Sequence, residues 1–189
     1  MSLTPAFELG LWNAWILMIP SLLISPFLLW LFYRDVWKNV AKKAASSAPT
    51  YKRLGYAISI VFYSLAVYSV FLPLEIGTIW LYSGLCIYSL GVAFDVMAMT
   101  SFARTPLDQP VTQGVYRFSR NPIYVGQFLV CMGIGIACLS WIFLLYGIAF
   151  IFLCNLFVSA EEQFCLQRYG NAYLEYMKKT PRWIGAPKF

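Results

Sequence analysis

Few residues in this sequence could perform acid–base or ion-binding chemistry, because the chain contains no histidine. Asp95 is the one acid inside a long apolar run, where desolvation makes a carboxylate costly and therefore a functional candidate. Glu161 and Glu162 are adjacent acids that follow the last apolar run. Since histidine is the commonest metal ligand and general base, we expect no metal site and look for chemistry at these acids.

Each acid also has a structural interpretation. Asp95 could reach the membrane interface or pair with a basic residue such as Arg104. Two acids at a helix C-terminus oppose the helix dipole, so Glu161 and Glu162 need a compensating partner unless they are solvated. That partner could be Arg117 or Arg120, or the hydroxyl or ammonium groups of a ligand.

A loop of about 20 residues, 100–121, precedes the fourth apolar run, and long connections in a compact protein are usually functional or disordered. Its aromatic residues argue against disorder. Asn121 is a suitable N-cap and Pro122 suits the first helical position, so a helix should begin here. With Arg120 beside it, this helix start could bind a carboxylate or phosphate, or it could simply anchor the loop on the basic side of a membrane.

The composition identifies the surroundings of these groups as a membrane. Hydrophobic residues make up 60% of the 189-residue chain and charged residues only 12%, against roughly 25% charged in a soluble domain. The net charge of +6 does not indicate nucleic-acid binding, because the basic residues lie between apolar runs, where membrane topology accounts for them.

We predict an all-α fold, a polytopic membrane helical bundle that forms one integral membrane domain over residues 1–189. All 14 Lys and Arg residues fall between the first and second spans, between the third and fourth, or after the fifth. Five spans therefore place every basic residue on the cytoplasmic side and the N-terminus outside. The loop 100–121 and a helical tail over 160–189 would then be cytoplasmic. The predicted spans are residues 11–33, 54–74, 76–99, 122–139 and 140–159.

An ordered set of short motifs in the C-terminal half resembles the isoprenylcysteine carboxyl methyltransferase and phospholipid methyltransferase superfamily. The resemblance covers roughly residues 100–184, with an uncharged hairpin between its first two motifs and the rest. The motifs are residues 111–116 (VTQGVY), 120–126 (RNPIYVG), the pair Glu161-Glu162, 169–176 (YGNAYLEY) and Pro181-Arg182.

The resemblance implies an S-adenosylmethionine-dependent methyltransferase that releases S-adenosylhomocysteine and methylates a lipid or small apolar N, O or S nucleophile. The cofactor would bind on the cytoplasmic side. The residues that match cofactor contacts are Asp108, Gln109, Pro110, Val111, Tyr116, Asn121, Pro122, Tyr124, Glu161 and Glu162. The catalytic candidates are Asp95, Arg120 and Glu161, among which the sequence does not choose.

Two positions depart from this family pattern. Members commonly carry a histidine where this chain has Asn121, which keeps a hydrogen bond but cannot act as a base. Isoprenylcysteine members carry an arginine, thought to meet the substrate carboxylate, where this chain has Phe157. The second departure argues against an isoprenylcysteine carboxylate substrate. The alternatives are a non-enzymatic membrane protein, such as a transporter subunit or assembly scaffold, and a distantly related membrane reductase.

Overall fold

The computed structural model describes residues 8–32, 49–106 and 108–187. Over this part of the chain the regular structure is entirely helical, as the sequence predicted. The elements are α1 (Trp15–Phe32), α3 (Pro49–Ser69), α4 (Ile79–Arg104), the 3-10 turn η1 (Gly114–Arg117), α5 (Pro122–Ala137), α6 (Trp141–Tyr169) and α7 (Asn171–Lys179).

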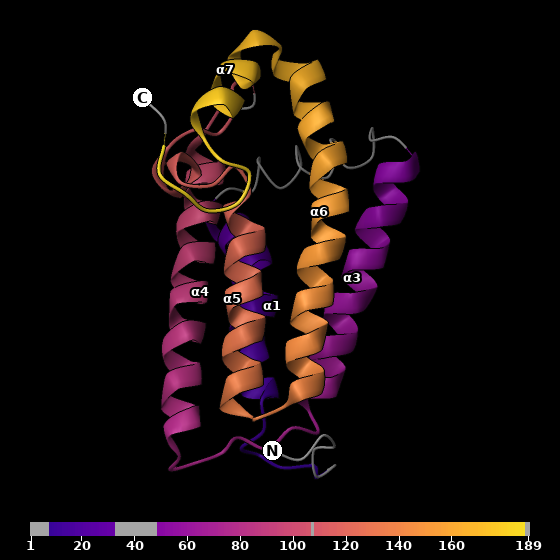
Figure 1. Cartoon of the computed structure of the whole chain (residues 1–189), viewed down its shortest axis with the longest axis vertical. Coiled ribbons are helices and arrows are strands. Elements are labelled where there is room, and N and C mark those ends of the chain that lie inside the picture. Colours follow the sequence, from indigo (N-terminus) through magenta and orange to yellow (C-terminus); the bar gives the residue numbers. More distant parts are fainter. Residues whose placement is uncertain (1–7, 33–48, 107, 188–189) are drawn as a thin grey trace.

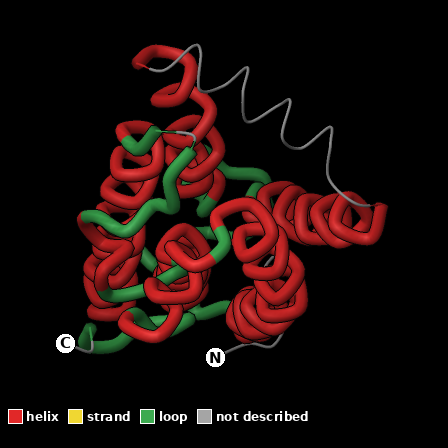
Figure 2. The backbone as a smooth tube through the Cα atoms, turned by 90° about the horizontal axis from the view of Figure 1, so that it is seen from above, coloured by secondary structure: helices red, strands yellow, loops and turns green. Residues whose placement is uncertain are grey.

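The long helices run roughly parallel to one axis, with α4 and α5 side by side, α1 behind them, and α3 beside α6 (Figure 1). The loop between α4 and α5, the helix α7 and the C-terminal segment all gather at one end of the bundle, whereas the N-terminal side of α1 lies at the other. Figure 2 looks down on the α7 end, where loops cross over the ends of the helices. The bundle therefore has one elaborated end, where a site can be built.

Glycines let α4 and α5 approach closely. A Cβ added at Gly84 would lie 2.5 Å from the Gly133 carbonyl oxygen, and one added at Gly133 would lie 2.5 Å from the Tyr88 amide nitrogen. Seven residues further along α4, a Cβ added at Gly91 would lie 2.8 Å from the Gly126 carbonyl oxygen. Small residues at such contacts let helix backbones pack tightly where the surrounding solvent is apolar. This close pair is the frame from which the α4–α5 loop emerges.

Asp95 lies inside this interface and is only 1% exposed. It accepts a hydrogen bond from the Gln127 side-chain amide of α5, and the backbone of Gly126 lies directly against it. The alternatives in which Asp95 reaches the interface or pairs with Arg104 are therefore wrong. Asp95 is a buried polar link between two helices.

Among the described residues, the two helices α4 and α6 are long and apolar enough to cross a membrane, and the Gly55–Ser69 part of α3 and α5 are shorter apolar helices. The total of five spans and the orientation of the termini stay predictions. The described basic residues lie on segments at the elaborated end, in keeping with the expected separation of charge (Figure 1). Five basic residues of the topology argument lie outside the described residues: Arg34, Lys38, Lys42, Lys43 and Lys188.

Two helix ends differ from the predicted spans at the 70–78 connection. The helix α3 ends at Ser69 instead of residue 74, and α4 begins at Ile79 instead of residue 76. The reason is a contact with a distant segment of the chain. Asn13 donates a 2.7 Å hydrogen bond to the Val70 carbonyl, the Ala14 backbone N–H donates to the Leu72 carbonyl, and the Leu74 N–H donates to the Trp12 carbonyl. Thr78 then caps α4 through the Leu81 amide.

The α4–α5 loop and the tail also differ from the prediction. Because α4 continues to Arg104, the loop is shorter than residues 100–121. The helix α6 runs without interruption from the predicted fifth span to Tyr169, where Gly170 adopts a φ of 55° and the chain turns into α7. Asn171 is the first residue of α7, and no side chain caps that helix.

We predict that Gly133→Ala destabilises the protein, because its methyl group would meet backbone atoms of α4 at 2.5 Å. Overpacking of this kind costs about 1–3 kcal/mol. Thermal unfolding in detergent, followed by tryptophan fluorescence, would measure the loss. Gly55→Ala is the matched control, since its Cβ meets only a Phe157 ring carbon at an ordinary 3.6 Å. Equal unfolding temperatures for the two variants would contradict this view of the α4–α5 contact.

Candidate active site

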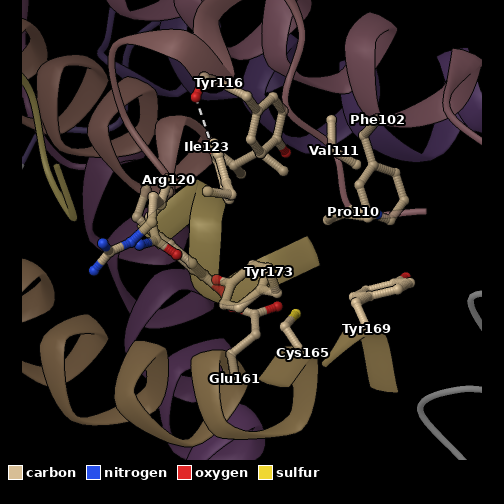
Figure 3. Close-up of a pocket in the computed structure, with 13 residues that line it drawn as sticks. Phe102, Pro110, Val111, Tyr116, Arg120, Ile123, Glu161, Cys165, Tyr169 and Tyr173 are labelled. Carbon is tan, nitrogen blue, oxygen red and sulfur yellow. Dashed lines mark hydrogen bonds between the residues drawn. The ribbon is translucent and has the colours of Figure 1, made fainter. Parts of the chain in front are cut away.

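A cavity lies at the elaborated end, between the α4–α5 loop, the start of α5, the end of α6, and α7. It holds about 660 Å³ of empty space, part of it open to solvent. In Figure 3, Glu161, Cys165 and Tyr169 of α6 lie on one side and Phe102, Val111 and Tyr116 on the other. The lining residues are Phe102, Pro110, Val111, Tyr116, Arg120, Asn121, Ile123, Tyr124, Glu161, Cys165, Tyr169, Tyr173 and Tyr176.

The start of α5 forms one wall. Pro122 occupies the first helical turn as predicted, but the Asn121 side chain makes no capping hydrogen bond. Instead the Asn121 side-chain amide donates a 3.1 Å hydrogen bond to the Arg182 carbonyl. The backbone N–H of Arg120 donates a 3.0 Å hydrogen bond to the Pro181 carbonyl. The predicted capping role of Asn121 is thus wrong, because the C-terminal segment lies within reach and offers its carbonyls.

A buried ion-pair cluster stands behind this wall. Glu162, whose side chain is 4% exposed, pairs with Arg120 at 2.9 Å and with Arg182 at 2.6 Å. Arg120 also donates to the carbonyls of Met177 and Thr180, at 2.9 and 3.0 Å. Arg120 is thus a partner of the acidic pair, as one alternative expected. Arg182 is a second partner that the sequence did not identify, and the cluster joins α5, α6, α7 and the tail.

Glu161 faces the other way, toward the cavity, and accepts a 3.0 Å hydrogen bond from the Tyr124 hydroxyl. The Tyr124 ring in turn meets the Phe157 ring edge-on, with 6.1 Å between centroids. This hydrogen bond restricts the carboxylate at the cavity wall. A half-buried carboxylate held in this way can bind a cation, accept hydrogen bonds from hydroxyl groups, or take up a proton.

Aromatic side chains make most of the remaining wall. The Tyr176 hydroxyl donates a 2.7 Å hydrogen bond to the Tyr116 backbone carbonyl. The rings of Tyr173 and Tyr176 pack edge to face. Burial raises the pKa of Tyr116, Tyr173 and Tyr176 above the ordinary value for tyrosine. These phenols therefore stay neutral at physiological pH. Aromatic faces beside a carboxylate form a site that suits an organic cation.

Comparison with known proteins identifies the family. Residues 74–172, more than half of the chain, match the phospholipid methyltransferase (PEMT) family. The chain belongs to the phospholipid methyltransferase family. No individual curated protein matches the chain significantly. The family match extends from the middle of the 70–78 connection to the beginning of α7, and thus includes most of the residues that line the cavity.

The structure brings together many of the residues that the resemblance singled out. Pro110, Val111, Tyr116, Asn121, Tyr124 and Glu161 line the cavity, as does the catalytic candidate Arg120. Glu162 is instead enclosed by arginines, and Pro122 is buried in the first turn of α5. Asp108 and Gln109 are exposed beside the cavity, and Asp95 lies in the α4–α5 interface.

Several lining residues were not named from the sequence: Phe102, Ile123, Cys165, Tyr169, Tyr173 and Tyr176. A signal for some of them was present. Tyr173 and Tyr176 are spaced to share one face of a helix, and the 169–176 motif contributes to the family resemblance. Phe102 gave no such signal, because it was assigned to a loop and lies on the helical extension of α4.

We predict that Glu162→Ala strongly destabilises the protein, since it leaves two guanidinium groups without their shared carboxylate. Removal of one partner from a buried ion pair costs about 3–5 kcal/mol. The unfolding temperature in detergent measures the effect. Glu175→Ala removes the exposed pair with Lys178 and should leave that temperature unchanged within error. A Glu162→Ala variant as stable as Glu175→Ala would contradict the structural role of the cluster.

Proposed function

We propose that this protein transfers a methyl group from S-adenosylmethionine to a nucleophile on a lipid or another small apolar acceptor. The observation that carries the proposal is the cavity in which Glu161 stands among neutral tyrosines, at the end of the apolar helix α6. Membership of the phospholipid methyltransferase family supports a methyltransferase and favours a lipid acceptor. We further propose that the cavity opens on the cytoplasmic side, where the basic segments gather.

The lining suits the chemical groups of S-adenosylmethionine. Glu161 and the tyrosine faces complement its sulfonium and ammonium cations, and the aromatic rings offer stacking surfaces to the adenine. The N-terminal end of α5, which begins at Pro122, offers backbone N–H groups and a positive dipole end to the methionine carboxylate.

In this proposal the protein mainly orients the methyl donor and the acceptor and excludes water from them, and it supplies few reactive groups of its own. S-adenosylmethionine supplies a methyl group already activated on a sulfonium. The aromatic wall keeps the reacting atoms out of water, and the Tyr124 hydroxyl fixes Glu161 at the wall. With both molecules bound, the wall would hold the acceptor's lone pair in line with the methyl carbon, and the electrons of the breaking carbon–sulfur bond would leave with sulfur.

An amine acceptor must also lose a proton, and Glu161 is the group that we propose receives it. Glu161 lines the cavity, whereas Asp95 is held by Gln127 inside the helix pair. The buried tyrosines stay protonated, and Arg120 is committed to Glu162 and two carbonyls. Of the three catalytic candidates, Glu161 is therefore the one whose position suits proton transfer.

The position of Phe157 bears on the acceptor. Its ring is buried and packs on Tyr124, so this place holds no positive charge for a substrate carboxylate. An acceptor that needs an arginine here is disfavoured, which supports a lipid without a carboxylate at its reacting end. The transporter, scaffold and reductase alternatives gain no observation of their own from the described residues.

We predict that S-adenosylhomocysteine binds the purified protein in detergent and that Glu161→Ala weakens this binding by at least about tenfold. Loss of a hydrogen bond to a charged group accounts for that size. Tyr124→Phe should weaken binding by a smaller factor of about two to ten, because Glu161 remains but loses its orienting hydroxyl.

Isothermal titration calorimetry would measure these affinities. Gln163→Ala is the matched control, because Gln163 is an exposed neighbour of Glu161 on α6. Absence of binding by the wild-type protein, in detergent and again in lipid nanodiscs, would overturn the proposed function.

Cys165 gives a second test, because it lines the cavity while Cys131, Cys138 and Cys154 are buried. In a Cys86→Ser background, which removes the exposed thiol, N-ethylmaleimide should label Cys165 and S-adenosylhomocysteine should slow that labelling. Mass spectrometry of the digested protein would follow the modified peptide over time. Labelling of Cys165 at the same rate with and without the ligand would contradict the placement of the cofactor.

A further inference from the structure

The two arginines that share Glu162 differ in their exposure and in how many of their N–H donors are already hydrogen-bonded. Arg120 is 10% exposed, and both its Nε and its Nη atoms are used by Glu162 and the carbonyls of Met177 and Thr180. The Arg182 side chain is 34% exposed. Its Nε and Nη2 atoms donate to Glu162 at 3.1 and 2.6 Å. Arg182 is therefore the more exposed of the two arginines.

The outer edge of Arg182 is only weakly engaged. Its Nη1 atom lies 3.4 Å from Asn155 Oδ1 and 3.3 Å from Ser159 Oγ, both long for hydrogen bonds of a guanidinium. Asn155, Ser159 and Glu162 follow one another at spacings of four and three residues, so they share one face of α6. Arg182 thus lies along a polar strip on an otherwise apolar helix.

The charges in this cluster do not balance. Glu162 supplies one negative charge against the two guanidinium groups of Arg120 and Arg182, and Glu161 is turned toward the cavity, where Tyr124 binds it. A positive charge in excess beside an apolar helix is costly unless an anion compensates it. The exposed edge of Arg182 is where such an anion can approach.

The depth of the polar strip indicates the source of the anion. Trp141 begins α6 and is 44% exposed, as is common for tryptophan at a membrane interface. At a rise of 1.5 Å per residue, Asn155 and Ser159 lie about 21 and 27 Å further along the helix. The hydrocarbon core is about 30 Å thick, so Arg182 meets α6 just below the level of the opposite lipid headgroups.

We propose that Arg182, with Asn155 and Ser159, forms a binding site for the phosphate group of a bilayer lipid. Glu162 orients the guanidinium through Nε and Nη2, and the outward N–H groups of Nη1 and Nη2 donate to phosphate oxygens. Ser159, whose hydroxyl donates to the Asn155 carbonyl, accepts weakly from Nη1 and holds that edge of the guanidinium in place. Arginine is suited to phosphate because its planar donors match two oxygens at once. The site does not require methyl transfer, so its failure and that of the proposed function are separate outcomes.

Native mass spectrometry of the full chain in detergent tests the site with dioleoyl phosphatidic acid as the probe. Dioleoylglycerol, which has the same chains and no phosphate, is the matched lipid. We expect the wild-type protein to prefer phosphatidic acid by at least about tenfold, and Arg182→Gln to lose that preference.

Asn155→Asp separates binding from folding. The new carboxylate would occupy the open edge of Arg182 while the pair with Glu162 remains, so the variant should keep its unfolding temperature and lose the preference for phosphatidic acid. Gln167→Glu, which adds an acid at an exposed position of α6, should retain the preference.

Inorganic phosphate distinguishes a lipid from a soluble anion. It should displace phosphatidic acid only at far higher concentration, because it lacks the acyl chains. Displacement at comparable concentration would overturn the lipid assignment. Equal binding of the two lipids by the wild-type protein, or an unchanged preference in both Arg182→Gln and Asn155→Asp, would overturn the site itself.

Discussion

One buried carboxylate organises the end of this molecule that carries the site. Glu162 of α6 pairs with Arg120, which precedes α5, and with Arg182 of the C-terminal segment. Arg120 then binds two carbonyls at the end of α7, and the backbone of residues 181–185 pairs with residues 118–120. Four segments that are distant in the sequence are thereby joined. Since a buried ion pair stabilises only when both partners stay in place, these segments are held together as a unit.

The cavity follows from this arrangement. With Glu162 directed into the ion-pair cluster, Glu161 must point to a different side of α6, because consecutive helical residues lie about 100° apart. That side faces Tyr124 and the cavity. The α4–α5 pair, drawn together by its glycines, supplies the rigid base from which the loop and the start of α5 reach the same place. One acid therefore holds the wall together, while its neighbour faces the cavity.

Much of the fold could be predicted from the sequence because apolar runs fix the helices. The hairpin between α5 and α6 and the start of α5 at Pro122 both followed from local signals. The 70–78 connection was misjudged because Asn13 stabilises it from a distant part of the chain. The contact of Asp95 with Gln127 was missed for a similar reason, since it depends on how α4 and α5 rotate against each other.

The site was only partly predictable for the same physical reason. Motifs indicated Tyr116, Tyr124 and Glu161, which the cavity brings together. They could not separate Glu161 from Glu162, because the direction of each side chain depends on the rotation of α6 within the bundle. Arg182 gave only the weak signal of a Pro-Arg pair near the C-terminus. Its role appears once the tail is seen to return across the start of α5 (Figure 1).

Direct photolabelling with S-adenosylmethionine carrying a radioactive methyl group would test the central claim that the cavity at this end holds the methyl donor. Ultraviolet irradiation of the wild-type protein, followed by proteolysis, locates the labelled peptides. The structure predicts label within residues 110–124 or 161–176, and loss of that label when excess S-adenosylhomocysteine is present. Label confined to other helices, or label that S-adenosylhomocysteine does not reduce, would contradict the account.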